Sequence, residues 1–87
     1  MTLEKNIQSL KRWKKKGDIL EARFLFNNFS ESLEATNKIG VLAEKHNHHP
    51  EITLSWGKVS IRLWSHDTKS ITERDINLAK DIDLLFQ

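Results

Sequence analysis

The chain has 87 residues, of which 38% are hydrophobic and 30% charged, and its formal net charge at pH 7 is +2. This length predicts a single domain, residues 1–87, with a small core, and the absence of cysteine excludes disulfides, thiolate nucleophiles and cysteine-ligated zinc. No apolar stretch approaches the roughly 20 residues that span a bilayer, and the first residues lack the layout of a signal peptide, so we expect a cytoplasmic protein without a membrane partner.

The first segment combines a helical pattern with a basic run. Leu3, Ile7 and Leu10 recur at helical spacing and predict a short helix, with Thr2 as a candidate N-cap. The run KRWKKK at 11–16 could bind phosphates, or its lysines could solvate a hairpin and protect an exposed sheet edge. No nucleic-acid-binding module accompanies the run, which favours the second interpretation and argues against a nucleic-acid partner.

Residues 19–26 alternate between apolar and polar side chains, which predicts a strand. Its apolar members are Leu20, Ala22, Phe24 and Phe26. We expect this strand to pair with a short strand near Trp13, across a turn at 16–18.

A longer helix is predicted after this strand. Ser30 is its expected N-cap, and the helix is expected to end near His46. Its predicted apolar face consists of Leu33, Thr36, Ile39, Gly40 and Ala43. Pro50, the only proline, keeps the following segment extended.

The segments 52–56 and 59–63 both alternate and are separated by two residues, which predicts a hairpin with a turn at Gly57 and Lys58. This register places the apolar residues of both segments on one face. The expected facing pairs are Trp56 with Val59, Leu54 with Ile61, and Ile52 with Leu63.

The same register brings the four histidines together. Three of them lie at 46, 48 and 49, and extending the hairpin places His49 opposite His66, so we predict that His66 lies within side-chain reach of the others. Imidazole nitrogens could bind zinc, but the adjacent side chains of His48 and His49 point to opposite sides of an extended segment. We therefore expect no metal site.

The last segment, Thr72-Glu-Arg-Asp75, has the form of a capping box that opens a final helix. A capping role for Asp75 is favoured over direct chemistry. The apolar positions of this helix are Ile76, Ala79, Ile82 and Phe86. The predicted element order is α-β-β-α-β-β-α, which is an α+β fold.

A set of spaced polar and aromatic residues resembles the pattern of the pterin-4a-carbinolamine dehydratases. The set comprises Glu44, His48, His49, Pro50, Trp56, His66 ten residues later, and Asp75 nine residues beyond. The resemblance extends over nearly the whole chain, from about position 13 to 86. It implies a four-stranded antiparallel sheet with helices packed on one face, in agreement with the elements predicted above.

The resemblance implies a dehydratase that converts 4a-hydroxytetrahydropterin to quinonoid dihydropterin and water. The leaving oxygen needs a proton donor and the pterin nitrogen a proton acceptor, and histidine can serve as either near neutral pH. The resemblance gives these roles to His48 and His66, without fixing which is which, and gives pterin orientation to His49. It implies substrate contacts for Glu44, His49, Ser65 and Asp75, with fixing an imidazole tautomer as the alternative for Glu44. Pterin is then the substrate, and no cofactor is implied.

The resemblance also implies self-association as a homodimer or homotetramer. An alternative function is a non-catalytic assembly module of the same fold that binds a protein partner. Glycine is common in the family at the position of Ser70, which calls into question a backbone with positive φ there. Trp13 and Trp64 are each candidates for stacking on a pterin or for packing in the core or an interface.

Overall fold

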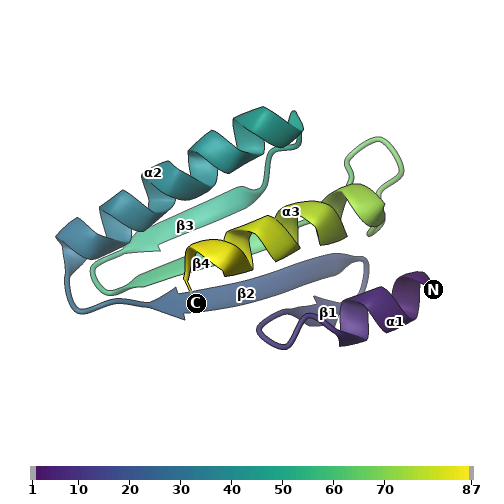
Figure 1. The fold of residues 1–87 in the computed structure, drawn as a ribbon, viewed down its shortest axis with the longest axis horizontal. Coiled ribbons are helices and arrows are strands. Elements are labelled where there is room, and N and C mark those ends of the chain that lie inside the picture. The colour runs from purple at the N-terminus through teal and green to yellow at the C-terminus, as the bar shows by residue number, and fades with distance from the viewer. Residues whose placement is uncertain (1, 87) are drawn as a thin grey trace.

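The computed structural model describes residues 2–86 as three helices and a four-stranded sheet (Figure 1). In chain order the elements are α1 (Leu3–Gln8), β1 (Lys14–Lys16), β2 (Ile19–Leu25), α2 (Phe29–His46), β3 (Glu51–Ser55), β4 (Lys58–Leu63) and α3 (Glu73–Leu85). The strand order is β1-β2-β4-β3, and each neighbouring pair is antiparallel. The predicted element order and α+β fold are confirmed.

The helices α2 and α3 lie next to each other and cover one face of the sheet (Figure 1). The core lies between these helices and the sheet, because alternate strand residues point toward the helices. Its most deeply buried side chains are Leu20, Ile39, Val59, Ile61, Leu63, Ile76, Leu78 and Ile82. No helix among residues 2–86 is long and apolar enough to cross a membrane.

The N-terminal elements form in the predicted order, although α1 ends at Gln8, before Leu10, and β2 ends at Leu25. Thr2 caps α1, and its hydroxyl accepts a hydrogen bond from the backbone N–H of Lys5 at 3.3 Å. β1 pairs with β2 through Lys16 and Ile19, so the turn consists of two residues. The first of these, Gly17, has a φ of +60°, a conformation that glycine adopts without steric penalty.

The predicted start of α2 is wrong by two residues. Asn28 is the N-cap, with its Oδ1 accepting a hydrogen bond from the backbone N–H of Glu31 at 2.8 Å, and Ser30 lies inside the first turn. Asparagine and serine are both strong N-cap residues, so their order in the sequence does not decide between them. Glu31 adds a second interaction that favours Asn28, because its carboxylate accepts from the backbone N–H of Asn27 at 3.0 Å.

The buried face of α2 is also rotated from the predicted one at its N-terminal end. Its buried residues are Ser32, Ala35, Ile39 and Ala43, whereas Leu33 is 42% exposed. Ser32 is tolerated in this face because its hydroxyl donates to the carbonyl oxygens of Asn28 and Trp56, both at 3.1 Å. The contact with Trp56 ties the start of α2 to the β3–β4 turn.

The predicted register of the β3–β4 hairpin is wrong by two residues. The turn is formed by Trp56 and Gly57, and the apolar facing pairs are Ile52 with Ile61 and Leu54 with Val59. A shift of two residues keeps every side chain on its predicted face, which is why the apolar pattern did not reveal it. Trp56 is instead expelled from that face and is 67% exposed.

The end of β2 explains the position of this turn. The backbone N–H of Phe26 donates to the carbonyl oxygen of Gly57 at 2.8 Å. A Cβ atom at Gly57 would lie only 3.0 Å from the carbonyl oxygen of Phe26, so glycine is needed at this close approach. The register is therefore set by a contact with a distant segment.

Candidate active site

The histidines at 48, 49 and 66 line one cleft of about 340 Å³. Two of them lie in the connection between α2 and β3, and the third lies in the loop between β4 and α3. The other residues that line the cleft are Asn47, Asp67 and Arg74. His66 thus lies on one cleft with His48 and His49, as predicted, but His46 does not. The predicted pairing of His49 with His66 is wrong, since the β-ladder ends at Glu51 and Arg62.

The end of α2 sets the directions of the first two histidines. Asn47 adopts a left-handed conformation with a φ of 48° and terminates the helix, and the backbone N–H of His48 donates to the carbonyl oxygen of Ala43 at 3.1 Å. The side chain of His48 is buried and that of His49 is exposed. Adjacent histidines therefore have different environments.

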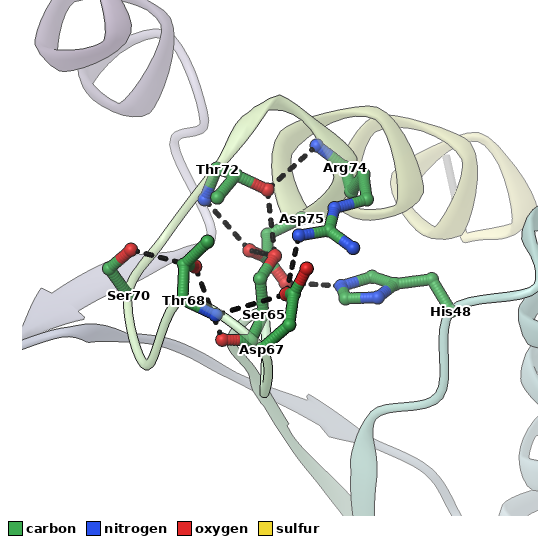
Figure 2. Close-up of polar contacts among 8 residues, drawn as sticks. All are labelled: His48, Ser65, Asp67, Thr68, Ser70, Thr72, Arg74 and Asp75. Atoms are coloured by element: carbon green, nitrogen blue, oxygen red, sulfur yellow. Dashed lines mark hydrogen bonds and ion pairs between the residues drawn. The ribbon is translucent and has the colours of Figure 1, made fainter.

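Asp75 connects His48 to the start of α3 (Figure 2). This carboxylate is fully buried, and its Oδ2 accepts hydrogen bonds from the backbone N–H of Thr72 and the hydroxyl of Ser65, each at 2.9 Å. Its Oδ1 lies 2.5 Å from Nε2 of His48. The predicted capping box is confirmed. The direct bond to His48 was not predicted.

The hydrogen bonds of Asp75 determine the tautomer of His48. Two hydrogen bonds to Oδ2 favour the ionised form of Asp75, and an ionised carboxylate can only accept, so Oδ1 is assigned as the acceptor toward Nε2 of His48. His48 then carries a proton on Nε2, and Nδ1 is the ring nitrogen that remains for the cleft. A carboxylate behind an imidazole in this way fixes both the tautomer and the ring orientation.

Ser65 is fully buried and uses its hydroxyl within the protein. Its Oγ lies 2.7 Å from Oγ1 of Thr72 and donates to Asp75, as Figure 2 shows. Ser65 and Asp75 do not line the cleft by their side chains; both lie behind His48. The structure thus places these two predicted substrate-binding residues where they support a histidine.

Glu44 pairs with His49 through its carboxylate and the Nε2 atom of the ring. Both side chains are exposed, and His49 lies on the cleft. This pair is the contact that fixing an imidazole requires, which is one of the two roles expected for Glu44.

Several contacts hold the loop that carries His66, and two of them join its ends. Ser65 and Ser70 form an isolated β-bridge, and the guanidinium of Arg74 donates to Oδ1 of Asp67 at 2.6 Å (Figure 2). This hydrogen bond lowers the pKa of Asp67 below its ordinary value of 3.8. The positive φ of the loop, 54°, falls on Lys69 and not on Ser70.

His46 lies outside the cleft. Its Nε2 pairs with Oδ2 of Asp81 on α3 at 2.7 Å, so it links the end of α2 to α3. Within residues 2–86, no group of three or more histidine, aspartate or glutamate side chains is arranged to hold a metal ion.

The family called Pterin 4 alpha carbinolamine dehydratase has a sequence model that matches residues 1–85. The chain belongs to this family. It is 37% identical over 83 residues to a protein of Sulfurisphaera tokodaii, with 95% of this chain and 89% of the relative covered. It is 39% identical over 88 residues to a protein of Hahella chejuensis, with 97% and 79% covered. Both relatives carry a provisional pterin-4-alpha-carbinolamine dehydratase name.

Two solved structures share the fold of this dehydratase family member. One is a transcriptional coactivator/pterin dehydratase from Brucella melitensis, with a TM-score of 0.90 and 25% identity over 100% of this chain and 98% of the other. The other is a pterin dehydratase-like protein identified as a RuBisCO assembly factor in the alpha-carboxysome, with a TM-score of 0.69 and 24% identity. That match covers 85% of this chain and 86% of the other, and shows a likeness of fold alone.

Sequence reasoning missed three residues that line the cleft of this family member: Asn47, Asp67 and Arg74. Asn47 had a signal, because asparagine at the end of a helix commonly adopts the left-handed conformation. No signal in the sequence indicates Asp67 and Arg74, because the conformation of the loop between them brings their side chains together. Trp13, by contrast, belongs to the core, where its Nε1 donates to Asp83 at 2.9 Å.

Proposed function

We propose that this protein catalyses the dehydration of 4a-hydroxytetrahydropterin to quinonoid dihydropterin, by general acid and base catalysis and with pterin as its substrate. The observation that carries this proposal is the pair formed by His48 and the buried Asp75, at a cleft that His66 also lines. A cleft of about 340 Å³ is within the size range of small-molecule sites and suits a bicyclic ring system.

The reaction breaks the bond between carbon 4a and its hydroxyl oxygen and removes a proton from the neighbouring ring nitrogen. The electron pair of the N–H bond forms the C=N bond, and the hydroxyl leaves as water after it gains a proton. No net oxidation occurs. One group must donate a proton and another must accept one, and each positioned group contributes about 10²- to 10⁴-fold to such a reaction. His48 and His66 supply these two groups in the proposal.

The other residues act by orientation. His49, held by Glu44, lies on the cleft where it can hydrogen-bond the pterin. Asp75 and Ser65 act through His48, because their side chains form one hydrogen-bonded network beneath its ring. This division separates three histidines that touch the substrate from carboxylates and a hydroxyl that fix their geometry.

Self-association, as a homodimer or homotetramer, is part of the proposal. Four large apolar side chains are exposed on α2 and on the β3–β4 turn: Phe29 (46%), Leu33 (42%), Val41 (57%) and Trp56 (67%). Exposed apolar groups of this size are typical of interaction surfaces. They equally support the second candidate function, a module that binds a protein partner.

A stopped-flow assay tests the proposed reaction. A pterin-dependent hydroxylase generates 4a-hydroxytetrahydropterin, and its disappearance is followed with and without this protein. We expect dehydration faster than the spontaneous reaction and proportional to protein concentration. A rate equal to the spontaneous one would leave the partner-binding function as the better account.

A further inference from the structure

His66 differs from the other three histidines in what holds its ring. The others each pair with a carboxylate: His46 with Asp81, His48 with Asp75, and His49 with Glu44. His66 has no hydrogen bond to any residue that the structure describes, and it is exposed. Its ring packs instead on the indole of Trp64, with the ring centroids 4.6 Å apart and the planes at 39°.

Trp64 supports His66 from outside the cleft. It follows the last residue of β4 and alternates with Ile61 and Leu63, which point into the core, so it lies on the side of the strand away from the helices. Trp64 is half-buried and does not line the cleft. Its contact with the site is therefore the ring of His66.

Arg62 packs on the same indole, with its guanidinium carbon 5.9 Å from the ring centroid. Arg62 is itself held from both neighbouring strands: its NH1 lies 3.0 Å from Oε1 of Glu51 on β3, and its Nε lies 3.7 Å from Oε2 of Glu21 on β2. Lys16 on β1 extends the series by pairing with Glu21 at 3.3 Å. These ion pairs connect all four strands and end at the indole next to His66.

We propose that Trp64 is a positioning residue for His66 and takes the place of the carboxylate that orients each of the other histidines. The proposal rests on the proposed function, in which His66 transfers a proton. An exposed imidazole on a loop has several rotamers, and only some bring a ring nitrogen within about 2.6–3.2 Å of a bound substrate. Packing of the His66 ring on the indole of Trp64 favours the rotamers in which the two rings are in contact.

Stacking has a chemical consequence that a carboxylate partner would not have. A carboxylate occupies one ring nitrogen, as Asp75 does in His48. An indole against the ring face occupies neither nitrogen, so both nitrogens of His66 stay available for the substrate and for exchange of the proton with water. His48 is thus held by a hydrogen bond to a carboxylate, and His66 by packing on an indole.

The test compares Trp64→Leu with Trp64→Phe in the stopped-flow assay, with His66→Ala as the reference. We expect Trp64→Leu to lower kcat by about 3- to 10-fold with little change in KM, because stacking of two rings shifts a rotamer equilibrium by roughly this factor. Trp64→Phe keeps a ring and should stay within about twofold of the wild type. A purely structural role would treat the two apolar replacements alike.

Nuclear magnetic resonance supplies a readout of the stack itself. The Cε1 proton of His66 should move downfield in Trp64→Leu, where the ring current of the indole is lost, and should remain shifted upfield in Trp64→Phe. If Trp64→Leu does not fold, Trp64→Met serves the same purpose with the same expectation.

Two results would overturn the inference in different ways. If Trp64→Leu keeps the wild-type kcat while His66→Ala lowers it by about 100-fold, the stack does not position His66, and the proposed function stands. If His66→Ala itself keeps the wild-type rate, His66 has no part in catalysis, and both this inference and its role in the proposed function are withdrawn.

Discussion

His48 and His66 line the same cleft but are fixed in opposite ways. His48 is 8% exposed, and its Nε2 is bonded to a fully buried carboxylate that also caps α3. His66 is exposed on a loop and rests on the face of an indole. The contacts of His48 therefore also stabilise the fold, whereas the ring of His66 packs on an indole on the outer face of the sheet. Substitutions around His48 should change both the reaction rate and the free energy of unfolding. Substitutions around His66 should change the rate with little effect on the free energy of unfolding.

The sharpest way to disturb the His48 side is Asp75→Asn. The amide oxygen can still accept from Thr72 and Ser65, but the amide nitrogen then faces Nε2 of His48 and forces the ring proton onto Nδ1. We expect kcat to fall by about 10²-fold or more, because Nδ1, the nitrogen left for the substrate, then carries the ring proton and can no longer accept one. The free energy of unfolding should fall by about 1–2 kcal/mol, as measured by denaturant titration.

Asp81→Asn is the matched control, because it makes the same change to the partner of His46 on the same helix but outside the cleft. We expect its kcat to stay within about twofold of the wild type. An equal loss of rate in both variants would mean that α3, and not the tautomer of His48, controls the reaction.

Glu44→Gln probes the exposed pair with His49. If His49 binds the pterin equally before and during the reaction, loss of its carboxylate partner should raise KM by about 3- to 10-fold and leave kcat nearly unchanged. Glu34→Gln is the control, since Glu34 also lies on α2 and pairs with Lys38 at 3.2 Å, away from the cleft. A fall in kcat with constant KM would instead place Glu44 and His49 in the chemical step.

Lys69→Gly tests the backbone of the His66 loop. A side chain at a φ of 54° is disfavoured, so glycine should raise the free energy of unfolding by up to about 1 kcal/mol. Asn47→Gly, at a φ of 48°, should gain less, because asparagine tolerates the left-handed region. Thermal unfolding of both variants provides the comparison, and a destabilised Lys69→Gly would show that another contact of the lysine matters more.

The smallest expected effect is the pH dependence of the pair between Asp67 and Arg74. Since the hydrogen bond lowers the pKa of Asp67 in the folded state, its contribution to stability is present above the ordinary carboxyl value of 3.8 and disappears as the pH falls through the lower value. Asp67→Asn should therefore unfold at a lower temperature than the wild type at pH 6. The two unfolding temperatures should converge as the pH falls below the lowered pKa that Asp67 has in the folded state. A constant difference across this range would contradict the assignment.

The local patterns of the sequence were sufficient for the elements and for the gathering of the histidines, because alternation and helical spacing report on burial. They were not sufficient for the hairpin register, since Gly57 and Phe26 meet across the sheet and a shift of two residues preserves the apolar pattern. Trp56 was read as a strand residue for its apolar character, yet it lies in the turn.

In the site, too, contacts between residues near in sequence were predictable, and contacts between distant residues were not. The capping box at Thr72 and Asp75 could be read from four residues, but the bond from Asp75 to His48 joins positions 27 residues apart. The stack on His66 had a readable signal, because Arg62, Trp64 and His66 alternate along one segment and so share a side of it. The sequence did not decide what packs on Trp64, for which a pterin, the core and an interface were the candidates.

Proton transfer by His48, held by Asp75, is tested by comparing the stopped-flow dehydration rates of His48→Ala and His46→Gln. We expect a rate about 10²-fold or more below the wild type for His48→Ala and a nearly normal rate for His46→Gln, whose amide can still reach Asp81. A wild-type rate in a folded His48→Ala protein, or an equal loss in both variants, would contradict this role of His48.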